Sequence, residues 1–190
     1  MIDETIEFKF FLEKFKLFKQ CGNNKIFTSK NKYLNTVINT LGASSYNQGL
    51  LYLCNGVEVE VMTKSIEDAF PKTKNTITCF GRDWLNRRLA VRNEEPYDIL
   101  RFDVVYNEVI NIPTTLKEFF ENEIIEYTDA LLSEKYFNQW KIKNHDVILS
   151  CSECVDYKIA PSLGGKDDVS NLEVLDYNVA WHLNMQLRVD

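Results

Sequence analysis

Glycine and proline are scarce in this sequence, with 7 and 4 residues among 190. So few of both argue against long disordered linkers. Only two histidines are present, His145 and His182, which leaves few side chains for acid–base catalysis near neutral pH. No stretch approaches the roughly 18 apolar residues of a membrane span, and the opening "MIDETIEFKFF" has acids where a signal peptide needs positive charge. We therefore expect a cytoplasmic protein with no membrane partner.

The cysteines are few and odd in number: Cys21, Cys54, Cys79, Cys151 and Cys154. An odd count without a signal peptide predicts reduced thiols. Cys151 and Cys154 form a Cys-x-x-Cys motif, but a redox pair of this kind usually begins a helix, and the following "VDYKIA" has an extended pattern. A zinc site would need a second pair of ligands. The favoured interpretation is two small, partly buried thiols, and a redox or metal role stays open.

Basic residues are outnumbered, 22 against 28 acidic ones, which leaves a net charge of −6. This balance argues against a nucleic-acid partner, because nucleic-acid binders usually carry a basic face. The negative charge is unevenly distributed along the chain. Residues 1–75 carry 8 acidic and 10 basic residues, whereas residues 144–190 carry 8 acidic and 3 basic residues. The last quarter of the chain therefore holds most of the negative charge and favours a basic partner.

Hydrophobic residues make up 45% of the chain, which is enough to bury a full core. We expect one domain over 1–190, in which a helical extension over 1–45 precedes the main part over 46–190. Periodic apolar residues predict an amphipathic helix over 3–20, with Ile6, Phe10, Phe11, Phe15 and Phe18 on one face, and further helices over 31–42, 114–124, 128–143 and 175–188.

Strands are predicted over 49–54, 75–80, 98–105 and 108–112, and residues 58–71 change from a strand-like alternation to a helical period. Helices thus precede and follow a group of strands. This order is typical of an α+β fold with a mostly antiparallel central sheet and helices packed on it.

The segment "LGGKDDVSNLEVLD" (163–176) is the most loop-like part of the chain. It fails as a calcium loop, because Val169 stands at a ligand position and the central glycine is missing. It fails as a phosphate loop, because an acid follows Lys166 where a Ser or Thr is needed. We interpret it as a loop in which Gly164 and Gly165 allow positive φ, Asp167 or Asp168 caps backbone N–H groups, and the acids face a partner.

No catalytic set is evident. A Gly-x-Ser-x-Gly motif is absent, His182 lies in an apolar helix and is interpreted as a packed residue, and His145 lies in a polar connector. We therefore expect neither an enzyme nor a cofactor. The segment "GRDWLNRR" (81–88) is interpreted as a turn held by an Asp83–Arg pair, with Trp84 either a core anchor or an exposed hot spot.

Three segments carry a resemblance to a known family: "ITCFGRDWLNRRLAV", "LRFDVVYNEVINIPTTLKEFFENEIIEYTDALL" and "DYKIAPSLGGKDDVSNLEVLD". Together they resemble the C-terminal domain of Tdi-type immunity proteins of type VI secretion, a domain that often follows a GAD-like domain. The resemblance covers about residues 49–187. The layout is also similar to that of the SUKH immunity superfamily. The sequence departs from the family at Asn86, where glycine is usual, at Arg88-Leu89, where Gln-Phe is usual, and in having an N-terminal part too short for a GAD-like domain.

The resemblance implies an immunity protein that binds a cognate antibacterial toxin, such as a basic DNase, and blocks it in the cytoplasm. We expect the partner-binding residues to be Asp167, Asp168, Glu173, Asp156, Glu153, Trp84 and Arg87. Charge complementarity would then speed association with the toxin. An intracellular adaptor or regulator of SUKH-like type, without a toxin partner, is the alternative function.

Overall fold

Seven antiparallel strands form one sheet in the computed structural model, which describes residues 8–22 and 25–187. Each strand pairs with its neighbours in sequence, so the order from edge to edge is β1 to β7. The strands are β1 (Leu17–Gln20), β2 (Ser44–Tyr46), β3 (Leu51–Leu53), β4 (Ile77–Asp83), β5 (Arg88–Arg92), β6 (Ile99–Asp103) and β7 (Glu108–Ile112). The α+β fold with a central antiparallel sheet is confirmed.

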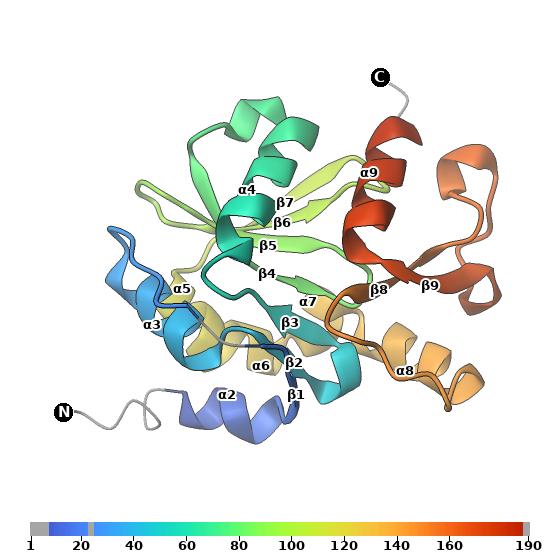
Figure 1. Ribbon diagram of the computed structural model, residues 1–190, viewed down its shortest axis with the longest axis horizontal. Helices are drawn as coiled ribbons and strands as arrows, with labels where there is room; N and C mark the ends of the chain where they lie inside the picture. The colour runs from blue at the N-terminus through green and yellow to red at the C-terminus, as the bar shows by residue number, and fades with distance from the viewer. Residues whose placement is uncertain (1–7, 23–24, 188–190) are drawn as a thin grey trace.

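Helices cover both faces of the sheet (Figure 1). Helices α4 (Glu58–Ala69) and α9 (Tyr177–Leu187) lie on one face. The other face carries α2 (Lys9–Lys14), α3 (Lys32–Leu41), α5 (Leu116–Glu118), a π-helical turn (Phe119–Glu123), α6 (Ile124–Glu126), α7 (Thr128–Leu132) and α8 (Glu134–Lys143). Within the described ranges, no helix combines the length and the apolar character that a membrane crossing requires.

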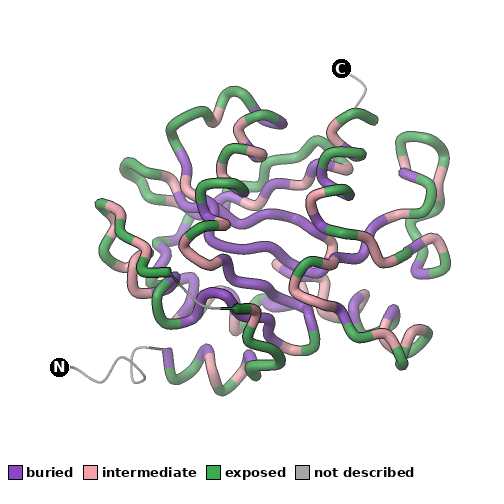
Figure 2. Tube along the Cα trace, in the orientation of Figure 1, coloured by how far each residue is buried: buried purple, intermediate pink, exposed green. Residues whose placement is uncertain are grey.

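The central strands are buried by these two layers, whereas both edge strands have mostly exposed residues (Figure 2). On the α2 side, the core is an aromatic cluster. Phe11 stacks on Phe15 with ring centroids 4.8 Å apart and meets Phe120 edge to face at 5.1 Å. Phe80 from β4 contacts both Phe119 and Phe120. The aromatic residues that the sequence concentrates near the N-terminus therefore anchor α2 to the sheet.

A separate hairpin lies beside the sheet and consists of β8 (Glu153–Tyr157) and β9 (Leu172–Asp176). The N–H of Val155 donates to the carbonyl oxygen of Trp84 at 2.7 Å, which joins the hairpin to the turn between β4 and β5. The Asp176 side chain accepts hydrogen bonds from the N–H groups of Asn178 and Val179 and so caps α9.

The prediction of one helix over 3–20 is wrong in its second half. Helix α2 ends at Lys14, and the chain then pairs as β1 with β2. The Asn47 side chain accepts from the N–H of Lys16 at 2.7 Å and donates to the carbonyl of Lys14, so tertiary contacts end the helix. Phe10, placed on the buried stripe, is 63% exposed. Ile6 and the start of this segment lie outside the described residues.

Three other expectations need correction. Residues 58–69 are entirely helical, although their alternating valines predicted a strand at the start. The Asn55 side chain accepts a hydrogen bond from the N–H of Glu58, and the Glu58 carboxylate accepts one from the N–H of Asn55. This reciprocal pair caps the helix and favours it over the strand. The helix over 128–143 is broken at Ser133, which has φ of 54°. Residues 172–176, assigned to a loop, form β9.

The expectation that all five cysteines are reduced thiols is also wrong. Cys21 and Cys151 form a disulfide with their Cα atoms 5.8 Å apart, across 130 residues of sequence. Cys154 does not pair with Cys151 and is a buried free thiol, as are Cys54 and Cys79. Spacing in sequence could not reveal this pair, because the fold brings the end of β1 beside the start of the hairpin.

Reduction of this disulfide is expected to destabilise the protein. A cross-link that closes so long a loop restricts the unfolded chain, and its removal typically costs about 2–5 kcal/mol. Dithiothreitol should lower the melting temperature of the wild type to that of a Cys21→Ser/Cys151→Ser variant, and should leave the variant unchanged. A thiol titration of the denatured protein should give the three free cysteines before reduction. An unchanged melting temperature after complete reduction would contradict a stabilising bond.

Candidate functional site

A small hollow of about 160 Å³ lies at one end of the sheet, where two strand turns, the α7–α8 junction and the hairpin meet. We call it the tyrosine–aspartate pocket. Its lining residues are Leu85, Arg87, Asp103, Val105, Tyr106, Ser133, Tyr136, Asp156, Tyr157 and Asp167. Larger hollows of about 410 Å³ and 760 Å³ are lined by lysines as well as glutamates, so neither has an excess of negative charge. We therefore place the candidate site in the smaller pocket.

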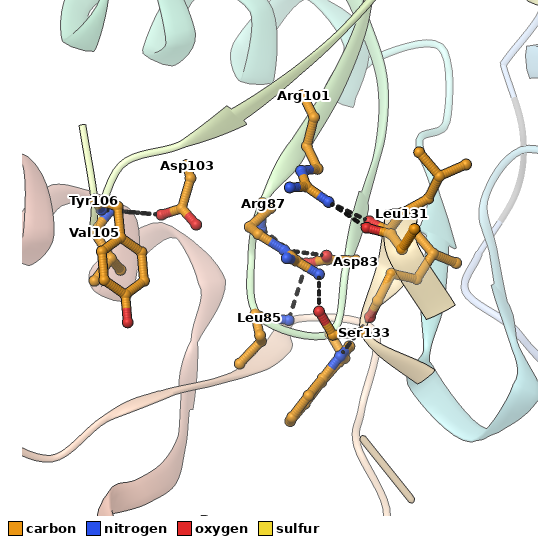
Figure 3. A network of polar contacts seen from close by, with 12 residues as sticks. Asp83, Leu85, Arg87, Arg101, Asp103, Val105, Tyr106, Leu131 and Ser133 are labelled. Carbon is orange, nitrogen blue, oxygen red and sulfur yellow. Dashed lines mark hydrogen bonds and ion pairs between the residues drawn. The ribbon is translucent and has the colours of Figure 1, made fainter. Parts of the chain in front are cut away.

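The β4–β5 turn forms one wall (Figure 3). Asp83 Oδ1 accepts hydrogen bonds from the N–H groups of Leu85 and Arg87, and Oδ2 accepts from Arg87 Nε at 2.6 Å. Both side chains are nearly buried, at 1% and 10% exposed. The predicted turn held by an Asp–Arg pair is thus confirmed, and Asn86 takes the positive φ (62°) that the turn requires.

Two arginines hold the α7–α8 junction against this turn (Figure 3). Arg87 Nη2 donates to Ser133 Oγ at 3.1 Å, and Arg101 from β6 donates to the carbonyl oxygens of Ala130 and Leu131. These bonds satisfy the last carbonyls of α7. They also fix the start of α8, which places Tyr136 at the pocket.

The opposite wall comes from the hairpin and its loop. Tyr157 Oη donates to Asp167 Oδ1 at 2.6 Å, Tyr136 Oη makes a longer contact of 3.5 Å with the same oxygen, and Tyr106 Oη lies 3.1 Å from Tyr157 Oη. Asp156 is deeper: Asn184 of α9 donates to its Oδ2 at 2.5 Å, and the Tyr157 N–H donates to its Oδ1.

Burial dominates the electrostatics of the pocket. It raises the pKa of the Asp156 carboxyl to about 6, with a further contribution from the negative charges of Asp103 and Glu173. Burial also raises the pKa of Asp103. The pKa of Tyr157 is raised by burial and by its hydrogen bond to Asp167. The tyrosines are therefore neutral donors, and Asp103 and Asp156 are acids partly or fully removed from water, whereas Asp167 lies at the surface.

The three carboxylates of the pocket outnumber its one lining cation, Arg87, whose positive charge opposes the rise in the pKa of Asp103. Arg87 is the basic residue among its lining, and its guanidinium is paired with Asp83 behind the wall. Within residues 8–22 and 25–187, neither Asp103 nor Asp156 nor Asp167 makes an ion pair. Like charges held together in a partly dehydrated space are unfavourable unless a cation joins them.

Three of the predicted partner-binding residues meet here: Asp156, Asp167 and Arg87. Trp84 is fully buried instead, since its indole donates to the carbonyl of Leu132 at 2.9 Å and its ring packs on Tyr136. Of its two interpretations, the core anchor is correct and the exposed hot spot is wrong.

The other predicted acids serve elsewhere. Asp168 Oδ1 accepts from the N–H of Ser170 at 2.7 Å and caps a short turn, as the self-capped loop predicted. Glu153 accepts from the N–H of Ser150, which closes the turn before β8. Glu173 is exposed on β9, directly across from Asp156 in the strand register.

Neither histidine belongs to the tyrosine–aspartate pocket. His182 is exposed on α9, so its interpretation as a packed residue is wrong, and His145 is exposed beside Asp146. In the part of the chain that the structure describes, no group of His, Cys, Asp and Glu side chains is arranged to hold a metal ion.

Sequence reasoning missed Asp103, Tyr106, Tyr136 and Tyr157. Two of them lie in "FDVVYNE", where a strand ends in an acid and a turn begins with a tyrosine, and Tyr157 follows Asp156 directly. Each pattern is common in turns. Only the pairing of β6 with β7 and the docking of the hairpin bring them to one place.

No protein-family model matches this chain, and no curated protein matches it. Among solved structures, the chain is similar to one described as the crystal structure of Atu4351 from Agrobacterium tumefaciens, with a TM-score of 0.62 and 18% sequence identity. The match covers 98% of this chain and 89% of that one. At this identity, the likeness shows a shared fold.

The Asp156→Asn variant tests the buried carboxyl. Because the folded pKa is raised above the ordinary value of 3.8, the unfolded chain binds fewer protons between about pH 4 and 6. The contribution of Asp156 to stability is therefore greatest below pH 4 and is lost as the pH rises through 6. The free energy of unfolding of the variant relative to the wild type should rise by roughly 1–3 kcal/mol between pH 4 and pH 8, measured by urea titration.

Asp168→Asn is the matched control, because its pKa is lowered by the hydrogen bonds from Ser170. The pH dependence of stability has the opposite sign for Asp168. Its carboxylate stabilises the fold above pH 4, and this contribution disappears as the pH falls below that value. A pH-independent difference for Asp156→Asn would show that this group ionises normally.

Gly165→Ala tests the loop that presents Asp167. A Cβ at this position would overlap the carbonyl oxygen of Ile159 and crowd Asn171, whereas a Cβ on Gly164 meets open space. Gly164 has φ of 85°, so its alanine variant should cost about 1–2 kcal/mol of strain. Gly165→Ala should cost more in thermal unfolding. Equal costs would mean that the loop moves aside freely.

Proposed function

We propose that this chain is an immunity protein that binds a cognate bacterial effector toxin and neutralises it. The toxin would be a basic nuclease, such as a DNase delivered by type VI secretion. One observation carries the proposal: the three segments on which the family resemblance rests meet at the tyrosine–aspartate pocket. "GRDWLNRR" supplies Arg87, "FDVVYNE" supplies Asp103, and "DYKIAPSLGGKDD" supplies Asp156 and Asp167.

The charge of this region supports a basic partner. The pocket carboxylates outnumber the one cation in the lining, Arg87, and the exposed Glu173 and Asp168 lie on the same hairpin and loop. A nuclease that grips nucleic acid must itself present positive charge. Complementary potentials would steer the two proteins together and raise the association rate.

Inhibition by binding requires no chemistry from this chain. The pocket tyrosines and carboxylates are held in hydrogen bonds to one another, and Ser133 accepts from Arg87. These are groups suited to recognition. A protein that covers the cationic groups of a nuclease would block its access to nucleic acid by occupancy alone.

A cytoplasmic location follows from this proposal, because a toxin that cuts DNA must be met where DNA is. Cytosolic reductants keep most protein thiols reduced. The Cys21–Cys151 pair would then form a dithiol in the cell, and the fold would rely on its core to keep the N-terminal strand in place.

Co-purification tests the proposal. The purified protein should form a stoichiometric complex with the secreted effector encoded beside its gene, and the nuclease activity of that effector should be lost in the complex. Failure to bind any neighbouring effector would sink the immunity function and favour an adaptor without a toxin partner.

Glu173→Lys tests the electrostatic part. Glu173 is exposed, and none of the hydrogen bonds in the described chain uses its carboxylate, so its reversal should not lower the melting temperature. Association with the effector should slow several-fold at low salt, and the difference should shrink above about 0.15 M salt, as measured by stopped flow. Glu94→Lys is the control, since Glu94 is exposed at the opposite end of β5. Equal rates for both variants would rule out steering by this face.

A further inference from the structure

The tyrosine–aspartate pocket has the composition of a cation receptor. Its carboxylates come from separate elements: Asp103 ends β6, Asp156 lies in β8, and Asp167 is in the following loop. Tyrosine rings stand between them, with Tyr106 and Tyr157 edge to face at 6.4 Å. Carboxylates hydrogen-bond a cation, and aromatic faces attract it through their quadrupole.

The depth of the pocket is graded. Asp156 is 5% exposed and forms its floor, whereas Tyr106 is 44% exposed and Asp167 lies at the surface, so both form its rim. Tyr157 holds the rim carboxylate in place through its 2.6 Å hydrogen bond. A long side chain that enters over the rim would meet a fixed acceptor first and a buried acid at the end.

The size of the pocket selects a single side chain. About 160 Å³ is below the roughly 300–1,000 Å³ of sites that enclose drug-sized ligands. A guanidinium fits this space better than an ammonium, because it is planar, stacks on tyrosine and is more weakly hydrated. Its several N–H donors can also reach carboxylates on two walls at once.

We propose that the tyrosine–aspartate pocket receives an arginine side chain of the protein partner. This inference rests on the proposed function for the identity of the partner, and it adds the contact that the partner must make. The arginine supplies the charge that the pocket lacks. It would act as the buried anchor of the interface, and exposed acids such as Glu173 would lie around it.

The test uses a small probe in place of the partner. N-acetyl-arginine amide is titrated into the full-length protein, and the ring signals of Tyr106, Tyr136 and Tyr157 are followed by NMR. We expect saturable shifts with a dissociation constant on the order of 1–10 mM, because one side chain buries little surface. N-acetyl-citrulline amide has the same shape without the charge, and it should produce no saturable shift. N-acetyl-lysine amide should bind several-fold more weakly.

Variants locate the binding. Asp167→Asn should weaken arginine amide at least fivefold, and Tyr157→Phe, which keeps the ring and removes the hydroxyl that holds Asp167, should weaken it less. Glu94→Gln removes one exposed carboxylate at the other end of the sheet and should leave the affinity unchanged. Should Asp167→Asn fail to fold, Asp156→Asn takes its place, since that variant is expected to be stable.

The outcomes separate this inference from the proposed function. Equal binding of citrulline amide, an unchanged affinity in Asp167→Asn, or tighter binding of lysine amide would overturn the arginine pocket. An effector complex without probe binding would leave immunity standing and remove the pocket. Probe binding without any effector complex would keep the pocket and remove immunity.

Discussion

The buried ion pair between Asp83 and Arg87 is the constraint on which the site depends. Burial of two charges is costly, and loss of one partner from such a pair typically costs about 3–5 kcal/mol. Here the pair sets the shape of a turn that contacts every neighbouring element. Within that turn, Trp84 binds the α7 end and β8, Asn86 donates to the carbonyl of Tyr177 at the start of α9, and Arg87 reaches Ser133. The turn is therefore the hub that assembles the pocket walls.

The pocket is electrostatically unfavourable in the free protein. Burial and mutual repulsion raise the pKa of Asp156, and in the described chain none of the three carboxylates makes an ion pair, although the charge of Arg87 acts on Asp103. Folding tolerates this because the carboxylates are hydrogen-bonded, Asp156 by Asn184 and Asp167 by Tyr157. Functional sites commonly carry such a local cost, and a bound cation would relieve it. Stability and recognition thus oppose each other at the same residues.

The N-terminal strand shows the same dependence on distant contacts. Strand β1 is an exposed edge that a short helix, the Asn47 side chain and the Cys21–Cys151 bond hold in place. Helical periodicity extends through this strand, but a strand partner and a side-chain acceptor stabilise the extended form more than one further helical turn would. The apolar stripe correctly placed Phe11 and Phe15 in the core, while the exposed Phe10 and Phe18 show where the period fails.

By itself, the sequence determined the α+β class, the strand meander, the Asp–Arg turn and the self-capped loop, because hydrophobic period, capping residues and turn residues act over a few positions. Only the tertiary structure decided which acids act together. It joined Asp156 and Asp167 with Asp103, and it assigned Asp168 and Glu153 to local turns. The reason is physical: a pocket forms where elements that are far apart in sequence pack together, and no local sequence pattern specifies which elements will meet.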